Sequence, residues 1–180
     1  MDQNLNWDEC YKVFRILHNV REKIGDSDFG LRAQGLLAHT LLRLGNKIIE
    51  INAQGHPDII VEMENQLIRL EVEAAIGKGR RRIIKDEDLE AIKPRTKNEI
   101  GYFAVLDCGL PFRWLLIDYE RLKWRNSELL FMITLYALLN EKISIKCTEE
   151  FSHMILSNAK QLPSLTFSIL RNRALRGEII

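Results

Sequence analysis

Apolar side chains recur along the chain with two different periods, and the change of period separates predicted helices from predicted strands. From residue 7 to 24 the spacing is helical and Gly25 ends it, which predicts a leading amphipathic helix. A second helix is predicted over 28–44, where Gly45 follows it. The expected buried stripe of the first helix consists of Trp7, Cys10, Tyr11, Phe14, Leu17 and Ile24.

After Gly45 the pattern changes to that of strands. An isoleucine-rich segment is followed by two segments in which apolar and polar residues alternate. A basic loop then leads into a short helix, with Asp86 as its expected N-cap and Pro94 beyond its end. The five predicted strands are 47–52, 58–64, 67–75, 102–107 and 113–118.

The region after residue 127 is predicted to be helical, with breaks near 141–147 and at Pro163. Its most apolar stretch, expected to be one buried helix, would span only about 16 Å at about 1.5 Å per residue, so we expect no membrane association. This order of elements predicts an α/β fold, a mixed sheet covered by helices. We expect a core with its N-terminal helix over 1–125 and a helical extension packed on it over 126–180.

Composition narrows the class of protein. The 180 residues suit one domain, and a net charge of +1 means that any binding to nucleic acid depends on local patches. Cys10, Cys108 and Cys147 are widely spaced and form no CxxC pair, which argues against a disulfide framework and a zinc cage. Together with the absence of an apolar leader, they predict a cytoplasmic protein.

The segment with the clearest chemistry is the predicted hairpin from His56 to Ala75. With Asn65-Gln66 as its turn, Asp58 is expected opposite Glu73. Strand alternation places Asp58, Glu71 and Glu73 on one face of the sheet. The other face receives the apolar side chains of Ile59, Val61, Ile68, Leu70 and Val72.

Carboxylates that lie this close together raise one another's pKa unless a positive charge neutralises them, and a divalent cation is a common solution. Mg²⁺ prefers hard oxygen ligands, which Asp58, Glu71 and the Val72 carbonyl can provide, and Mn²⁺ is expected to substitute. The alternative is a solvated outer face of a sheet, where charged residues also alternate. The sequence contains no phosphate loop or dinucleotide fingerprint, so no small-molecule cofactor is expected.

Pro57-Asp58 followed by Glu71-Val72-Glu73, on a hairpin entered from a helix and a strand, resembles the PD-(D/E)XK superfamily of restriction-endonuclease-like nucleases. The similarity covers about residues 29–118 and is nearest to archaeal Holliday-junction resolvases and Mrr-like nucleases. It implies a three-layer core and a metal-dependent phosphodiesterase. By this resemblance Asp58 and Glu71 bind the cation and Glu73 helps to activate the attacking water.

Two positions depart from the family's common pattern. Position 73 is most often lysine, although some restriction enzymes of this class have glutamate there, and the helix position often filled by glutamate is Gln34. Glutamate can act as a general base or bind a second metal ion. Lys78, in a Gly-Lys-Gly loop, is a candidate for a migrated lysine. Gln34 and His56 are expected beside the metal ligands, where His56 could move a proton.

A basic run leaves the strand that carries Glu71 and Glu73, and it would emerge beside the metal site. It could hold a DNA phosphate backbone, and the alternative is a solvated loop. The run consists of Lys78, Arg80, Arg81, Arg82 and Lys85.

These patterns predict a Mg²⁺-dependent endonuclease that hydrolyses DNA, in which Asp58, Glu71 and Glu73 are catalytic. Gln34 and Glu73 favour one rival interpretation, a nuclease-fold DNA-binding module without activity. A second rival is a protein-interaction module that uses the apolar C-terminal helices. We expect a homodimer.

Overall fold

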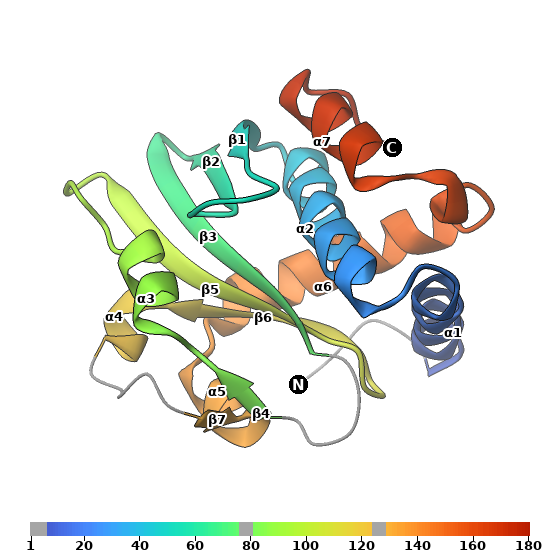
Figure 1. The fold of residues 1–180 in the computed structure, drawn as a ribbon, viewed down its shortest axis with the longest axis horizontal. Helices are drawn as coiled ribbons and strands as arrows, with labels where there is room; N and C mark the ends of the chain where they lie inside the picture. The colour runs from blue at the N-terminus through green and yellow to red at the C-terminus, as the bar shows by residue number, and fades with distance from the viewer. Residues whose placement is uncertain (1–6, 76–80, 124–128) are drawn as a thin grey trace.

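The molecule is built on a five-stranded mixed sheet (Figure 1). The computed structural model describes residues 7–75, 81–123 and 129–180, and for residues 81–83 and 129–134 it describes the backbone alone. Strands in the sheet lie in the order β1-β2-β3-β5-β6, and only β3 and β5 are parallel neighbours. The strands are β1 (Lys47–Ile51), β2 (Ile59–Met63), β3 (Gln66–Ala75), β5 (Glu99–Asp107) and β6 (Arg113–Asp118).

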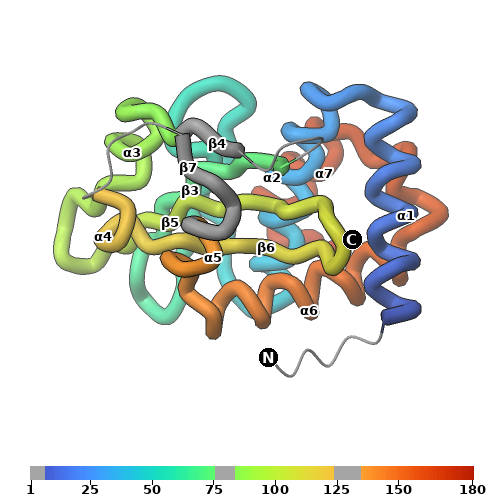
Figure 2. Tube along the Cα trace, turned by 90° about the horizontal axis from the view of Figure 1, so that it is seen from below, coloured from blue at the N-terminus to red at the C-terminus, as the bar shows by residue number. Residues whose placement is uncertain are grey.

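Helices cover both faces of this sheet, so the three-layer α/β architecture expected from the sequence is confirmed. On one face α2 (Asp26–Arg43) and α6 (Glu141–Asn158) lie against the strands, while α1 (Trp7–Ile24) and α7 (Phe167–Leu175) pack on α2. The other face is covered by α3 (Asp86–Ile92), α4 (Tyr119–Leu122) and α5 (Met132–Leu138). Helix α1 lies at the opposite end of the molecule from α3 and α4 (Figure 1, Figure 2).

A hydrophobic cluster lies on each face of the sheet, because successive side chains of a strand point to opposite faces. Ile59, Val61, Ile68 and Leu70 are buried beneath α2, as the sequence pattern predicts, and Val72 packs against the same cluster. The odd-numbered side chains of β3 therefore face the layer that contains α3. On the neighbouring strand, odd-numbered apolar residues continue that face beneath α3, α4 and α5.

The first helix has the predicted bounds, but its buried stripe differs from the expected one. Trp7 is 70% exposed and Tyr11 is 51% exposed, so neither belongs to the core. Both residues lie outside the face of α1 that contacts α2 and α6. Aromatic residues do not by themselves determine which face a helix buries. The residues that α1 buries are Cys10, Val13, Leu17 and Val20.

The C-terminal region also differs from its prediction. The stretch expected as one buried helix begins with strand β7 (Leu129–Phe131), which pairs with β4 (Arg81–Ile83), and α5 follows. The break expected near 141–147 lies just before that range, at residues 139–140, where Asn140 accepts a hydrogen bond from the Ile143 N–H and caps the start of α6. From Glu141 to Asn158 the helix is continuous. The break at Pro163 is confirmed by a 3₁₀ turn over Leu162–Ser164. Buried residues of α6 and α7 belong to the same hydrophobic cluster as α2 and the sheet.

Candidate functional site

The hairpin formed by β2 and β3 carries the predicted carboxylates, with a register different from the one expected. Its turn is Glu64-Asn65, both with positive φ, and residues 59 and 70 face each other. A two-residue turn with positive φ at both positions matches the twist of the strands, and Gln66 is paired with Met63 instead of belonging to the turn. Because pairing is displaced by two residues, each side chain keeps its face, and Asp58 comes beside Glu71 instead of opposite Glu73.

Asp58 sits where β2 begins, and hydrogen bonds fix its backbone. The Asn52 N–H donates to the Asp58 carbonyl at 2.9 Å, and the Gln34 amide donates to the carbonyls of Asn52 and Asp58 at 2.7 and 2.9 Å. Gln34, only 4% exposed, therefore ties the ends of β1 and β2 to α2. A glutamate could not make these two donations, which explains physically why an amide suits this position.

The Asp58 carboxylate reaches across to β3. Its Oδ2 accepts a hydrogen bond from the Val72 N–H at 2.8 Å. In an extended strand the N–H and C=O of one residue point to the same side, so the Val72 carbonyl also faces the side of β3 where β2 begins. Asp58, Glu71 and the Val72 carbonyl thus lie near one another at the open end of the hairpin.

Glu71 is the most unusual residue of this group. Its side chain is only 9% exposed, and Oε1 lies 2.7 Å from Nδ1 of His56. Oε2 is buried and has no hydrogen-bond partner among the described residues. A buried carboxylate oxygen without a partner is costly, so this position requires a proton or a cation.

Burial and mutual repulsion raise the pKa of both carboxyl groups. Burial is the main cause of the rise for Asp58, whose pKa reaches about 6 against the opposing effects of the Val72 N–H and His56. For Glu71, burial and then the charge of Asp58 raise the pKa to about 9, against a smaller opposing effect of the Asp58 backbone N–H. Without a cation, Glu71 therefore holds a proton at neutral pH, and a bound cation would have to displace it.

Glu73 lies one step further along the same face of β3. Its side chain is exposed, in contrast to that of Glu71. The charge of Glu73 contributes to the raised pKa of both Asp58 and Glu71, which places its carboxylate within electrostatic reach of them. The structure thus gathers the three predicted carboxylates on one face, two of them sheltered and one open to solvent.

Helix α3 adds carboxylates that the sequence analysis did not include. Asp86 is its first residue and not its cap. Lys85 is the N-cap, and the Lys85 N–H donates to Asp88 Oδ2 at 3.0 Å in a capping box. The charge of Asp88 raises the pKa of Asp58 and Glu71. The Asp-Glu-Asp run directly after the basic segment is the signal in the sequence, of which only Asp86 was predicted to have a role, as the N-cap.

Two contacts bring α3 down onto the strands. Arg69, which is buried, donates through Nε to the Ala91 carbonyl at 2.9 Å. Gly101 on β5 lies under the end of the helix, where a Cβ would come within 1.7 Å of the Ile92 carbonyl oxygen. The missing side chain therefore permits the close approach that sets Asp88 beside the hairpin.

The predicted basic run is only partly described. Lys78 and Arg80 lie outside the described residues. Arg81 and Arg82, expected in a loop, belong to strand β4, because their backbone pairs with that of Phe131 and Leu130. Lys85 is described: its Nζ lies 3.3 Å from Glu87 Oε1, and this contact, followed by the charges of Asp88 and Glu73, raises its pKa.

All three cysteines are buried free thiols. Among the helices that the structure describes, none is both long and apolar enough to cross a membrane. No protein-family model and no curated protein matches the chain.

Proposed function

We propose that this protein is a divalent-metal-dependent nuclease of the PD-(D/E)XK type that hydrolyses DNA phosphodiester bonds. The observation that carries the proposal is Glu71, a buried carboxylate with one unpartnered oxygen beside a second carboxylate, Asp58. Such a pair is unfavourable as a purely structural feature, because neither burial nor the like charge stabilises the ionised form. A bound cation compensates for both the burial of the charge and the repulsion between the two carboxylates.

The available ligands suit Mg²⁺, with Mn²⁺ as its substitute. Asp58, Glu71 and the Val72 carbonyl offer hard oxygens only, and Mg²⁺ is usually held by one or two carboxylates together with water and substrate phosphate. When bound, such a cation neutralises non-bridging phosphate oxygens and makes an attacking water more acidic.

The other charged residues supply the remaining functions. Glu73 is exposed on the same face, so it can accept the proton of the attacking water. Lys85 lies close enough to Glu73 for the two charges to interact, which gives the site a cation in place of the usual lysine at position 73. Lys78, Arg80, Arg81 and Arg82 follow β3 in the sequence and would hold the phosphate backbone outside the site.

The decisive assay is cleavage of labelled duplex, branched and single-stranded DNA with Mg²⁺, with Mn²⁺ or with a chelator. Asp58→Asn keeps an oxygen for the Val72 N–H but loses the charge, so it should lose both Mg²⁺ binding and cleavage. Glu73→Gln should reduce cleavage by about 10² or more with DNA binding retained. Glu64→Gln, an exposed residue at the turn of the same hairpin, is the matched control.

Cleavage that survives in the chelator or in Asp58→Asn would refute the metal-dependent mechanism. DNA binding without cleavage of any substrate in either metal would leave the inactive DNA-binding module as the function.

A further inference from the structure

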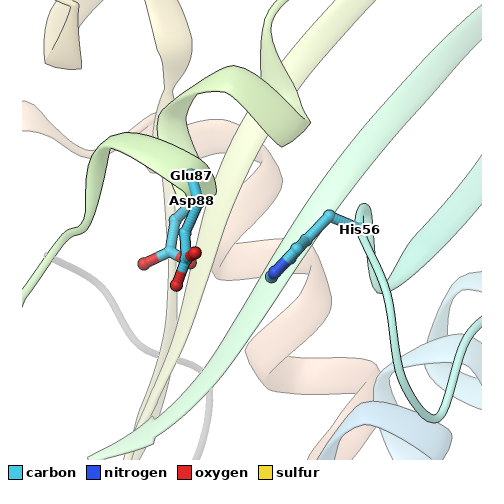
Figure 3. A group of neighbouring side chains, drawn as sticks. All are labelled: His56, Glu87 and Asp88. Atoms are coloured by element: carbon cyan, nitrogen blue, oxygen red, sulfur yellow. The ribbon is translucent and has the colours of Figure 1, made fainter.

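Three side chains outside the proposed Mg²⁺ ligands converge on one point. His56 comes from the loop between β1 and β2, and Glu87 and Asp88 come from the first turn of α3. One ligand atom from each lies within 4.8 Å of the other two. Figure 3 shows the His56 ring extending from its loop toward the two carboxylates. The sequence separates the histidine from the carboxylates by about thirty residues, so tertiary packing alone brings them together.

The contact between His56 and Glu71 orients the imidazole ring as a metal ligand requires. Nδ1 of His56 lies 2.7 Å from Oε1 of a carboxylate whose side chain is 9% exposed and whose second oxygen has no partner among the described residues. When Nδ1 carries the proton, it donates to Glu71, and Nε2 keeps its lone pair. Histidines that bind metals are typically held in this way by a carboxylate on the other ring nitrogen.

We propose that His56, Glu87 and Asp88 bind a second divalent cation, a transition ion such as Zn²⁺ or Mn²⁺. Imidazole nitrogen favours these ions over Mg²⁺, which prefers oxygen ligands. One histidine and two carboxylates provide three protein ligands and leave a further position open to water or substrate, as in catalytic zinc sites. The inference goes beyond the proposed nuclease activity and does not require it.

The contacts that these carboxylates already make are compatible with a cation. Asp88 accepts the Lys85 N–H through Oδ2, so its other oxygen remains available. Glu87 is paired through Oε1 with the Lys85 ammonium at 3.3 Å, but both side chains are more than half exposed. An exposed pair of this kind contributes little, and a divalent cation can displace the ammonium group.

The test uses Zn²⁺ on the full chain, with histidine ring nitrogens observed by NMR and affinity measured by calorimetry. The His56 nitrogen should shift on Zn²⁺ addition while those of His18 and His153, which lie on α1 and α6, do not. Asp88→Asn keeps the helix cap but removes the charge, and it should weaken Zn²⁺ binding at least tenfold, as should Glu87→Gln. Asp86→Asn, an exposed neighbour on the same helix, is the matched control and should bind Zn²⁺ as the wild type does.

Asp58→Asn separates this site from the proposed Mg²⁺ site. It should abolish the Mg²⁺-dependent response while the His56 shift with Zn²⁺ persists. If His56 does not shift, or if Asp88→Asn binds Zn²⁺ as tightly as Asp86→Asn, the second site does not exist, whatever the outcome of the cleavage assay. Loss of cleavage in Asp58→Asn with an intact His56 response would support both proposals.

Discussion

Replacing Glu71 by glutamine should stabilise the metal-free protein at alkaline pH. The Glu71 side chain is 9% exposed, and burial raises its pKa to about 9 from an ordinary value of 4.5. Glutamine has nearly the same shape, can accept the hydrogen bond from His56, and carries no charge. It therefore removes the cost of burying a carboxylate while leaving the packing in place.

The sign and size of the effect follow from the two pKa values. Because the folded-state pKa of Glu71 is raised, its contribution to stability is fully present below about pH 4.5 and is lost as the pH rises toward 9. At about 1.4 kcal/mol per pKa unit, this loss between pH 5 and pH 8 is at most about 4 kcal/mol. Local relaxation around the charge reduces it, so we expect about 2–4 kcal/mol, or roughly 5–15 °C in melting temperature.

The measurement is thermal and urea unfolding of wild type and Glu71→Gln at pH 5 and pH 8 in a chelator. Comparing the change between the two pH values cancels the constant cost of burying an amide. Glu64→Gln, exposed at the hairpin turn, controls for charge removal at the surface. Adding Mg²⁺ at pH 8 should then stabilise the wild type and not Glu71→Gln, because this cation binds only the ionised carboxylate.

Parallel loss of stability in wild type and Glu71→Gln between pH 5 and pH 8 would refute this reasoning. It would mean that the folded protein accommodates the Glu71 charge without a cation, and the main support for a metal site would disappear.

Two further substitutions test the surroundings of the site. Gln34→Glu removes both donations to the carbonyls of Asn52 and Asp58 and buries a charge, so urea unfolding should show a loss of about 3–5 kcal/mol, and unchanged stability would contradict the role assigned to the amide. Replacing the arginines of the run at 80–82 with alanine should weaken DNA binding and lower the slope of log K against log salt by up to about 0.9 per lost contact. An unchanged slope would show that these arginines do not contact phosphate.

Much of the fold follows from local pattern. Strand β6 and helix α1 have the bounds that periodicity and terminating residues predict, and the other strands of the sheet agree within three residues at each end. The apolar face of the hairpin was also predictable, since alternation with period two fixes which side chains share a face. The wrong predictions concern residues whose environment depends on tertiary packing, as for the exposed Trp7 and for strand β7 in a stretch expected to be helical.

The candidate site likewise has one part that local sequence pattern predicts and one part that depends on tertiary packing. Strand alternation is enough to predict that Asp58, Glu71 and Glu73 share one polar face, because a displacement of two residues in the register leaves every side chain on its side. The burial of Glu71 against His56 and the approach of Asp88 from α3 depend on tertiary packing. These contacts depend on Arg69 and Gly101 docking a helix across the strands, an interaction between distant segments that no local period encodes.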